Sequence, residues 1–442
     1  MNRTYLFLFL LPSLFCVSQP IPVQFTVHDS FASTGYYFLS NPDRFLLLDR
    51  FGEIIYYRSC STQTPIYNFA LQPNGLITYS NLHCYYIMDS TFTTIDSIAD
   101  AGNYVLDKHD LRLLPNGHFL FMGMETVPVK ADKKAEENAT DSLARANSKW
   151  VTVLELDAAK KLVFEWRAKQ SIKREEIDSF FIANNQFLSW THANAIELDQ
   201  DGNILISMRN YNEITKINRT TGAVMWRLGG KANQFKYINC PVPFYGQHDI
   251  RRLPNGNITL FDNGNHTKPH GARALEFELD EKKKTAELKW SYTFDTAIYS
   301  TRSGNVQRLK NSNTLINYGN LGRNTEDHIC FVIVNPKGEK VLEARGVNSY
   351  RIFNYASLPW QIHRPQITCF DSLGVTYLDA GAGHLSYLWS TGDSTQIIPI
   401  TSPGNYSVFV PYGKAGGYVN SEKWVVTDAA NLCKPLRLNG RK

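Results

Sequence analysis

The chain has 442 residues, of which 43% are hydrophobic and 20% charged, so it can bury a large core in two or more domains. Its formal net charge of +5 is small for this length, and its Lys and Arg residues are scattered along the chain. This distribution excludes nucleic acid as the main partner, because nucleic-acid binding requires a concentrated basic surface.

Residues 1–18 have the pattern of a signal peptide. Arg3 precedes an apolar run that ends in small residues at positions 16–18. We expect cleavage before Gln19 and export to the periplasm, the cell surface or the medium. Since no later segment approaches the length of a membrane span, we expect no spanning segment.

A repeating unit organises residues 19–362. Two alternating apolar runs flank an Asn-Gly type of turn, and the copies at 109–117 and 248–256 are identical at seven of nine positions. A third copy spans 192–203, and weaker copies surround the turns at 49–53, 72–75 and 309–312. Repeated units of this kind are typical of an all-β fold with a six-bladed β-propeller. A series of β-sandwiches or a β-solenoid fits less well, because neither repeats polar residues at the start of each first strand.

Two segments depart from this repeat. Residues 130–148 are charged and poor in apolar periodicity, which predicts a solvated insertion. Residues 363–442 have the character of a small immunoglobulin-like β-sandwich domain. Six cysteines follow the leader, so disulfides are plausible in an exported protein, and we consider the pairs Cys60–Cys84 and Cys369–Cys433.

Three histidines share one position of the repeat. Aligned on their turns, His109, His192 and His248 all lie at the start of a first strand, which lines the central channel of a propeller. Asn194 follows His192 by two residues and so shares its face of the strand, and Arg209 ends the next strand. This set of imidazoles, an amide and a guanidinium favours an anionic ligand.

The aspartates next to two of these histidines receive a different prediction. Asp110 and Asp249 directly follow His109 and His248, so regular strand alternation directs them away from the channel.

Several other chemistries lack their required motifs. The chain has no G-x-S-x-G elbow, no P-loop, no H-E-x-x-H and no C-x-x-C. We therefore expect no cofactor and no metal. The residues leave one chemical alternative open, because three histidines with a free coordination position can hold a metal that activates water.

Five short motifs occur in order along the chain: H-x-N at 192–194, S-x-R at 207–209, W-R-L-G-G at 226–230, Q-H-D at 247–249 and D-N-G at 262–264. By these motifs, residues 100–350 resemble the bacterial arylsulfotransferase family. The family implies an exported six-bladed propeller that moves a sulfuryl group from an aryl sulfate donor to a phenolic acceptor, without a nucleotide donor. Its mechanism is ping-pong through a sulfated histidine.

The resemblance also implies roles for single residues. His248 corresponds to the nucleophile, and His109, His192, Asn194 and Arg209 correspond to catalytic, substrate-binding positions around the sulfuryl group. Residues 300–303 are the candidate region for a further polar group from the last blade. Homo-oligomerisation stays open. Two other functions remain as alternatives: a non-catalytic propeller that binds anionic ligands at the cell surface, and a metal-dependent hydrolase or lyase that uses the same histidines.

Overall fold

The computed structural model describes residues 23–29, 31–61, 63–99, 104–128, 147–183, 190–265, 271–293, 300–319, 329–428 and 431–433. These residues form an all-β protein with two compact units. The large unit comprises Pro22–His363 with Tyr412–Val419, and the small unit contains Arg364–Pro411 and Asn420–Lys442. The predicted signal peptide (1–18) and most of the predicted insertion (130–148) lie outside the described residues.

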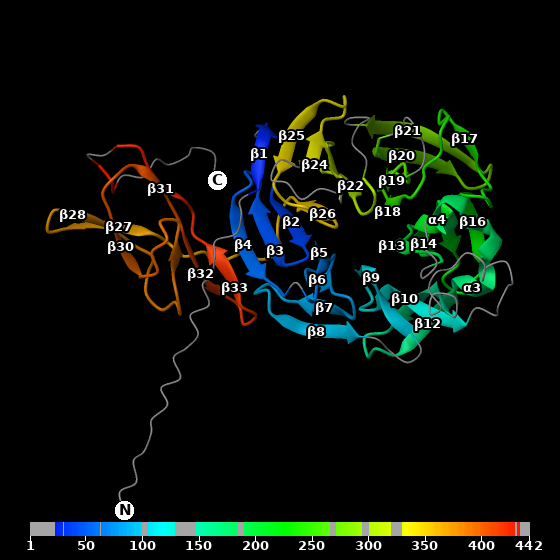
Figure 1. Ribbon diagram of the computed structural model, residues 1–442, viewed down its shortest axis with the longest axis horizontal. Coiled ribbons are helices and arrows are strands. Elements are labelled where there is room, and N and C mark those ends of the chain that lie inside the picture. The colour runs from blue at the N-terminus through cyan, green and yellow to red at the C-terminus, as the bar shows by residue number, and fades with distance from the viewer. Residues whose placement is uncertain are drawn as a thin grey trace, which may run out of the picture. The chain divides into compact units, whose positions relative to one another are not determined.

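The described residues of the large unit form six sheets, which follow one another around a common centre (Figure 1). Neighbouring strands within each sheet are antiparallel, except that one strand is added in parallel. From the innermost strand outward, the first two sheets are β5 (Tyr67–Leu71), β6 (Ile77–Ser80), β7 (Cys84–Met88) and β8 (Thr94–Ala99), and β9 (Tyr104–Leu113), β10 (Phe119–Pro128), β11 (Asn147–Leu156) and β12 (Leu162–Arg167). The third and fourth are β13 (Ala193–Leu198), β14 (Ile204–Met208), β15 (Glu213–Ile217) and β16 (Val224–Gly229), and β18 (His248–Arg252), β19 (Ile258–Asp262), β20 (Arg273–Asp280), β21 (Thr285–Thr293) and the parallel β17 (Lys236–Ile238). The fifth and sixth are β22 (Asn305–Arg308), β23 (Thr314–Asn317), β24 (Ile329–Val334), β25 (Lys340–Arg345) and β1 (Gln24–His28), and β26 (Ile352–Tyr355), β2 (Tyr36–Asn41), β3 (Arg44–Asp49), β4 (Ile54–Ser59) and β33 (Gly417–Asn420).

One strand of each sheet is an inner strand, which contacts the inner strands of two other sheets. Thus β9 contacts β5 and β13, β18 contacts β13 and β22, and β26 contacts β22 and β5. This arrangement is propeller-like. Its first-strand hairpins are the predicted ones: Gly117 and Gly256 adopt φ of 81° and 89° in the turns after β9 and β18, a conformation that glycine tolerates without strain.

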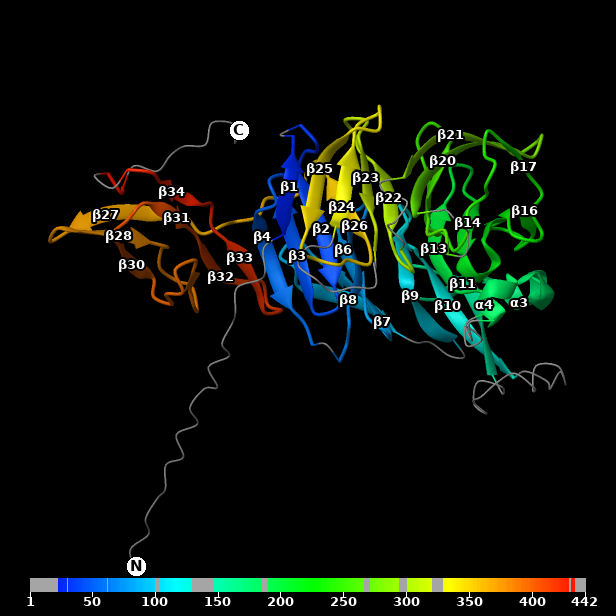
Figure 2. The same cartoon turned by 45° about the horizontal axis from the view of Figure 1, so that its top comes forward.

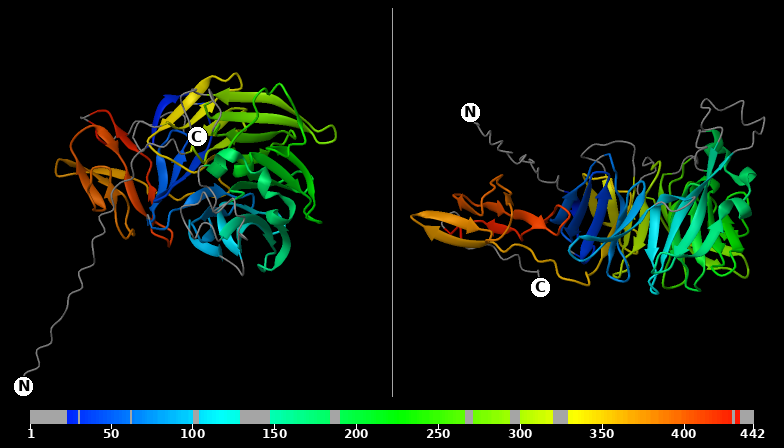
Figure 3. Two further views of the ribbon diagram at one scale, coloured as in Figure 1. Left: turned by 45° about the vertical axis from the view of Figure 1, so that its right-hand side comes forward. Right: turned by 90° about the horizontal axis from the view of Figure 1, so that it is seen from below.

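Strands from both ends of the large unit are paired with each other. Strand β1 adds to the outer edge of β25, and β26 supplies the inner strand beside β2. Figures 2 and 3 show the N-terminal strands in blue beside the yellow strands β24 and β25. The predicted turn at 49–53 thus belongs to a sheet whose inner strand is β26. This strand lies about 300 residues later in the chain.

Apolar side chains of neighbouring sheets form the cores. Leu228 of β16 and Ile214 of β15 pack in one cluster with Ile250 of β18 and Leu275 of β20, and all four are fully buried. Equivalent clusters join the sheets of β7 and β9, of β10 and β14, and of β19 and β24. Burial on both faces explains why these strands contain continuous apolar runs. The packed sheets hold the inner strands in a fixed register around the centre.

Short helices lie between β12 and β13 and after β14. They are α3 (Ala168–Ser171), η1 (Arg174–Glu176), α4 (Ser179–Ala183) and η2 (Arg209–Tyr211). No helix among the described residues is long and apolar enough to cross a membrane.

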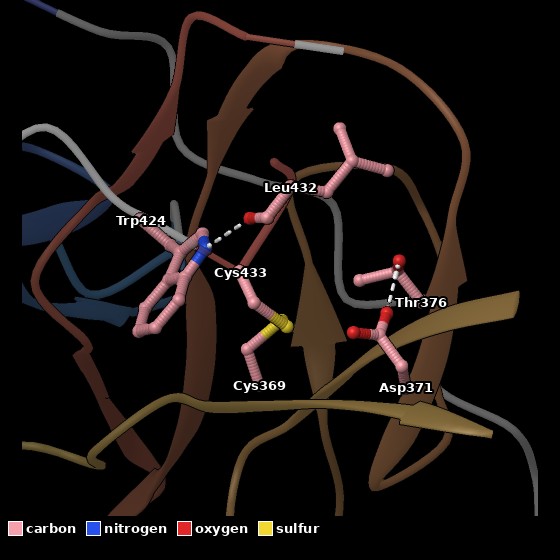
Figure 4. The surroundings of a disulfide bond; sticks show 6 residues. All are labelled: Cys369, Asp371, Thr376, Trp424, Leu432 and Cys433. Carbon is pink, nitrogen blue, oxygen red and sulfur yellow. Dashed lines mark hydrogen bonds between the residues drawn. A yellow bond between two sulfur atoms is a disulfide. The ribbon is translucent and has the colours of Figure 1, made fainter. Parts of the chain in front are cut away.

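The small unit contains short strands and a disulfide. The strands are β27 (Thr368–Ser372), β28 (Val375–Asp379) and β30 (Ile397–Ile400) in one sheet, the pair β29 (Leu388–Trp389) and β32 (Val408–Tyr412), and the pair β31 (Gly404–Tyr406) and β34 (Trp424–Val426). Figure 4 shows the predicted Cys369–Cys433 disulfide, beside which the Trp424 indole donates to the Leu432 carbonyl. The other predicted pair is wrong: no disulfide joins Cys60 and Cys84, which lie at the end of β4 and the start of β7, in different sheets.

Removing this disulfide should destabilise the small unit. In the chain-entropy model, closing a loop with a separation of 64 residues contributes about 4 kcal/mol to the free energy of unfolding. We expect the double variant Cys369→Ser/Cys433→Ser to unfold its small unit at lower temperature in scanning calorimetry. Wild-type protein scanned with a reductant serves as the control and should reproduce the variant; an unchanged transition in the variant would contradict the prediction.

Candidate active site

A cavity of about 550 Å³ opens among the inner strands of the large unit. His109, His192 and His248 all line it, as the shared position in the repeat predicts. Its other lining residues are Ser40, Asn41, Pro42, Ile66, Tyr67, Lys108, Arg302, Ser303, Gly319, Gly346, Val347, Asn348, Ser349 and Tyr350.

His248 is the most constrained of the three histidines. It begins β18 and is only 2% exposed. Its Nδ1 lies 2.6 Å from the Asn263 side-chain oxygen and 3.1 Å from the Gly246 carbonyl oxygen. Its Nε2 accepts the backbone N–H of Ser303 at 3.1 Å. Because a backbone N–H can only donate, Nε2 carries a lone pair and Nδ1 carries the proton.

The surroundings of His248 and His192 keep both imidazoles neutral. Burial lowers the pKa of each well below the ordinary value of 6.5, and the positive charge of Arg209 lowers both pKa values further. A neutral imidazole retains an unprotonated ring nitrogen, whereas an imidazolium has none. The site therefore holds the His248 imidazole neutral at neutral pH, with Nε2 unprotonated.

With His248 as the nucleophile of sulfuryl transfer, which the family resemblance implies, its lowered pKa predicts how the transfer rate depends on pH. Since the pKa of His248 is lowered, its neutral form persists below pH 6.5, and kcat/KM should stay level as the pH falls through that value. The variant Arg209→Gln removes the neighbouring positive charge, so the pKa of His248 rises and the acid limb moves to higher pH. The pH profile of kcat/KM measures this shift. If the acid limb of Arg209→Gln stays in place or moves to lower pH, His248 is not the group whose protonation limits kcat/KM.

His109 is held by a carboxylate. Its Nδ1 lies 2.5 Å from the Asp107 side-chain oxygen, which also accepts the His109 backbone N–H at 2.9 Å. The ring centroid of His109 lies 5.4 Å from that of His192 and 5.7 Å from that of Tyr350. A carboxylate in this position orients the imidazole. The His109 ring is thus held in place at the cavity, beside His192 and Tyr350.

Asn194 and Arg209 lie beside the cavity and are absent from its lining. Asn194 is fully buried, and its side-chain amide donates to the Gln247 carbonyl at 2.7 Å, which fixes the peptide that precedes His248. The Arg209 guanidinium donates to the Thr301 carbonyl at 3.2 Å and lies over the Phe181 ring, 4.6 Å from its centroid. Asn194 therefore positions the peptide that precedes His248, and Arg209 acts on His192 and His248 through its charge.

The prediction that Asp110 and Asp249 point away from the channel is wrong. Strand alternation fails here because β9 and β18 contain bulges: three steps of β18, from His248 to Arg251, face two steps of β19, and Asp249 has a left-handed φ of 60°. The register of β9 also shifts, by more residues: the five steps from Leu106 to Leu111 face the two steps of β10 from Gly123 to Phe121. A bulge turns two consecutive side chains toward the same side of a strand.

The two aspartates form a buried ionic layer with arginines. Arg351 contacts Asp110 at 3.1 Å and Asp249 at 3.0 Å, and Arg251 contacts them at 2.9 and 2.6 Å. Burial alone would raise the pKa of Asp110, but the charges of Arg251 and Arg351 outweigh burial and hold the pKa below its ordinary value. Arg351 also donates to the backbone carbonyls of His109 and Asn194 at 3.2 and 2.6 Å. This layer fixes the strands that carry the histidines.

Several residues of this site were not found from the sequence. Tyr350 and Arg351 immediately precede β26, whose sheet has no Leu-Pro-Asn-Gly turn after its inner strand, so the repeat gave no signal for them. Asn263 belongs to the D-N-G motif, which could have indicated it. The candidate region 300–303 does reach the cavity, through Arg302 and Ser303.

A metal site formed by the three histidines was the chemical alternative that the sequence left open. Among the residues that the structure describes, no group of His, Cys, Asp and Glu side chains is arranged to hold a metal ion. The Nδ1 atoms of His109 and His248 contact Asp107 and Asn263, and Nε2 of His248 accepts a backbone N–H.

Fold and site together define an all-β protein of propeller-like architecture with a histidine-lined cavity among its inner strands. The family model Arylsulfotransferase (ASST) matches residues 23–351, and the chain belongs to this family, as its motifs predicted. Family membership implies a sulfotransferase whose substrates are aryl sulfates and phenols. No curated protein sequence matches the chain.

Several solved structures are similar to this chain at low identity. A protein of unknown function from Bacteroides caccae is 13% identical with a TM-score of 0.47, over 72% of this chain and 98% of that chain. A streptogramin B lyase is 12% identical with a TM-score of 0.40, over 80% and 93% of the two chains. A virginiamycin B lyase from Staphylococcus aureus is 11% identical with a TM-score of 0.36, over 81% and 95%. Similarity at this level carries no argument about the chemistry.

Proposed function

We propose that the protein is an aryl-sulfate sulfotransferase that works by a ping-pong mechanism through a sulfohistidine at His248, without a nucleotide donor. The observation that supports this most directly is the state of His248. It is a buried, neutral imidazole whose Nδ1 proton is held by Asn263 and whose Nε2 lone pair lies at the cavity. The cavity belongs to a chain of the arylsulfotransferase family.

In the first half-reaction, Nε2 of His248 attacks the sulfur of the donor. A nitrogen–sulfur bond forms, the bond between sulfur and the aryl oxygen breaks, and the phenolate leaves with the electron pair of that bond. The Ser303 N–H, which now donates to Nε2, would then donate to a sulfuryl oxygen. The Nδ1–H of His248 donates its hydrogen bond to the Asn263 side-chain oxygen throughout, which stabilises the positive charge that the ring develops.

In the second half-reaction, the oxygen of a phenol attacks the sulfur, and the bond between sulfur and His248 breaks. The departing phenolate of the first step gains a proton and the attacking phenol loses one, so a single group can serve both steps. The pairing with Asp107 favours His109 for this role, since the carboxylate fixes the orientation of the ring at the cavity. His192 stays neutral and packs beside it.

The proposal extends to architecture and location. Six sheets whose inner strands contact one another in sequence support a six-bladed propeller, and the small sheets with their disulfide support an immunoglobulin-like domain. Export is supported by the leader pattern at residues 1–18 and by the Cys369–Cys433 disulfide, because disulfides persist in oxidising compartments.

The test is release of nitrophenolate from 4-nitrophenyl sulfate by the purified protein, with and without phenol and in the presence of a chelator. We expect release that depends on the phenol and ignores the chelator. Hydrolysis by water that disappears with the chelator would establish the metal-dependent alternative. Absence of release, with tight binding of the aryl sulfate, would establish the binding-protein alternative.

A further inference from the structure

The charges that line the cavity are unbalanced. Lys108 and Arg302 both line it, and no carboxylate does so within the described ranges of the chain. A donor molecule brings one negative charge on its sulfate ester. The lining therefore retains positive charge after the sulfuryl group is bound.

The two cations also differ from the arginines of the buried layer. Arg251 and Arg351 each contact Asp110 and Asp249, whereas the described part of the structure places no carboxylate within ion-pair distance of Lys108 or Arg302. Lys108 is half-buried and Arg302 is exposed, so neither needs a carboxylate partner inside the protein. Two cations at one cavity still create a positive potential there, which favours an anionic ligand.

The positive charge of Lys108 lies beside two tyrosine rings of the cavity, those of Tyr67 and Tyr350. Its Nζ lies 4.2 Å from the centroid of the Tyr67 ring, and Tyr67 meets Tyr350 edge-to-face with centroids 5.9 Å apart. Both tyrosines line the cavity. The Lys108 charge also lowers the pKa of His192, after the larger effects of burial, Arg209 and the other histidines, which places it near the histidine cluster. An aryl ring that packs on these tyrosines would thus lie within reach of the lysine.

We infer that the phenolic substrate of this enzyme carries a carboxylate in addition to its reacting oxygen, and that Lys108 and Arg302 bind that carboxylate. This inference rests on the proposed function, because it concerns the acceptor of the same reaction. Its substrate class is phenolic acids. Lys108 and Arg302 then determine specificity and leave the transfer step itself to the histidines.

Two matched acceptors test the inference. The phenols 4-hydroxyphenylacetate and 4-hydroxyphenylacetamide have nearly the same shape and the same reacting group, and only the first carries a carboxylate. With 4-nitrophenyl sulfate as donor, we expect kcat/KM for the acetate to exceed that for the amide about tenfold, the combined effect of two partly solvated charge pairs. Tyramine, which carries a positive charge, should be the poorest acceptor of the three.

The double variant Lys108→Gln/Arg302→Gln should reduce the ratio of the two kcat/KM values to about one, since it removes both pairs. Lys310→Gln is the control, because Lys310 is an exposed lysine in the turn after β22 and outside the cavity. It should keep the wild-type ratio. Circular dichroism checks that each variant is folded.

The outcomes separate this inference from the proposed function. Equal transfer to acetate and amide by the wild type would overturn the inference and leave the sulfotransferase in place. If no acceptor supports release, the proposed function fails, and calorimetric titration of the two ligands then decides the inference separately. Tighter binding of the acetate that the double variant loses would support the carboxylate site, and equal binding would refute it.

Discussion

Replacing His248 with alanine should reduce sulfuryl transfer by about 10⁴-fold or more, because the variant has no group that can form the covalent intermediate. The buried ring is replaced by a methyl group, and the Ser303 N–H loses its acceptor. Nitrophenolate release in the presence of phenol measures the loss. Intact-mass analysis after incubation with donor alone should detect the added sulfuryl group in the wild type and not in the variant.

Two further variants test whether the loss of activity in His248→Ala is due to loss of the nucleophile. His83→Gln changes an exposed histidine in the turn before β7 and should retain transfer. Asn263→Ala removes the acceptor of the Nδ1 proton while leaving the nucleophile in place, so it should lower kcat and still form the sulfated intermediate. Full activity of His248→Ala would disprove the ping-pong mechanism at this residue.

The second large effect concerns stability. Arg351→Leu should lower the free energy of unfolding by about 3 kcal/mol or more, since it leaves two buried carboxylates with Arg251 as their remaining arginine. The same change removes the donors to the carbonyls of His109 and Asn194, so activity should fall with stability. Denaturant unfolding of the purified variant measures the change.

Two comparisons identify the cause of this loss. Arg345→Leu removes a half-exposed arginine of β25 that pairs with Glu343, and should cost less than about 1 kcal/mol. The double variant Arg351→Leu/Asp110→Asn removes one of the uncompensated charges as well, so it should recover part of the stability. If Arg351→Leu unfolds like the wild type, the ionic layer does not stabilise the large unit.

The repeat made much of this architecture predictable. Alternating apolar runs and Asn-Gly turns are local properties of the chain, so they indicated the strands, the hairpins at Gly117 and Gly256, and the shared position of three histidines. Cys369 and Cys433 were paired correctly, but Cys60 and Cys84 were not, since cysteine spacing contains no information on which sheets lie side by side.

The inner bulges were not predictable in this way. A regular strand directs Asp110 and Asp249 away from the channel, and only the register against β10 and β19 shows that they turn inward. The contributions of Tyr350, Arg351 and Asn263 were missed for a related reason, and Ser303 was predicted only as part of the candidate region 300–303. These residues reach the site through contacts between distant parts of the chain, as in the bond from Ser303 to His248.

The all-β class, the family and the shared position of the three histidines could be predicted from the amino-acid sequence alone, because each depends on residue identity and spacing along the chain. The tertiary structure decided which groups act on those histidines. Asn263 and Ser303 set the protonation of His248, Asp107 orients His109, and the ionic layer around Arg351 fixes the strands beneath them. These roles depend on distances across six sheets, and such distances exist only once the sheets have packed around their common centre.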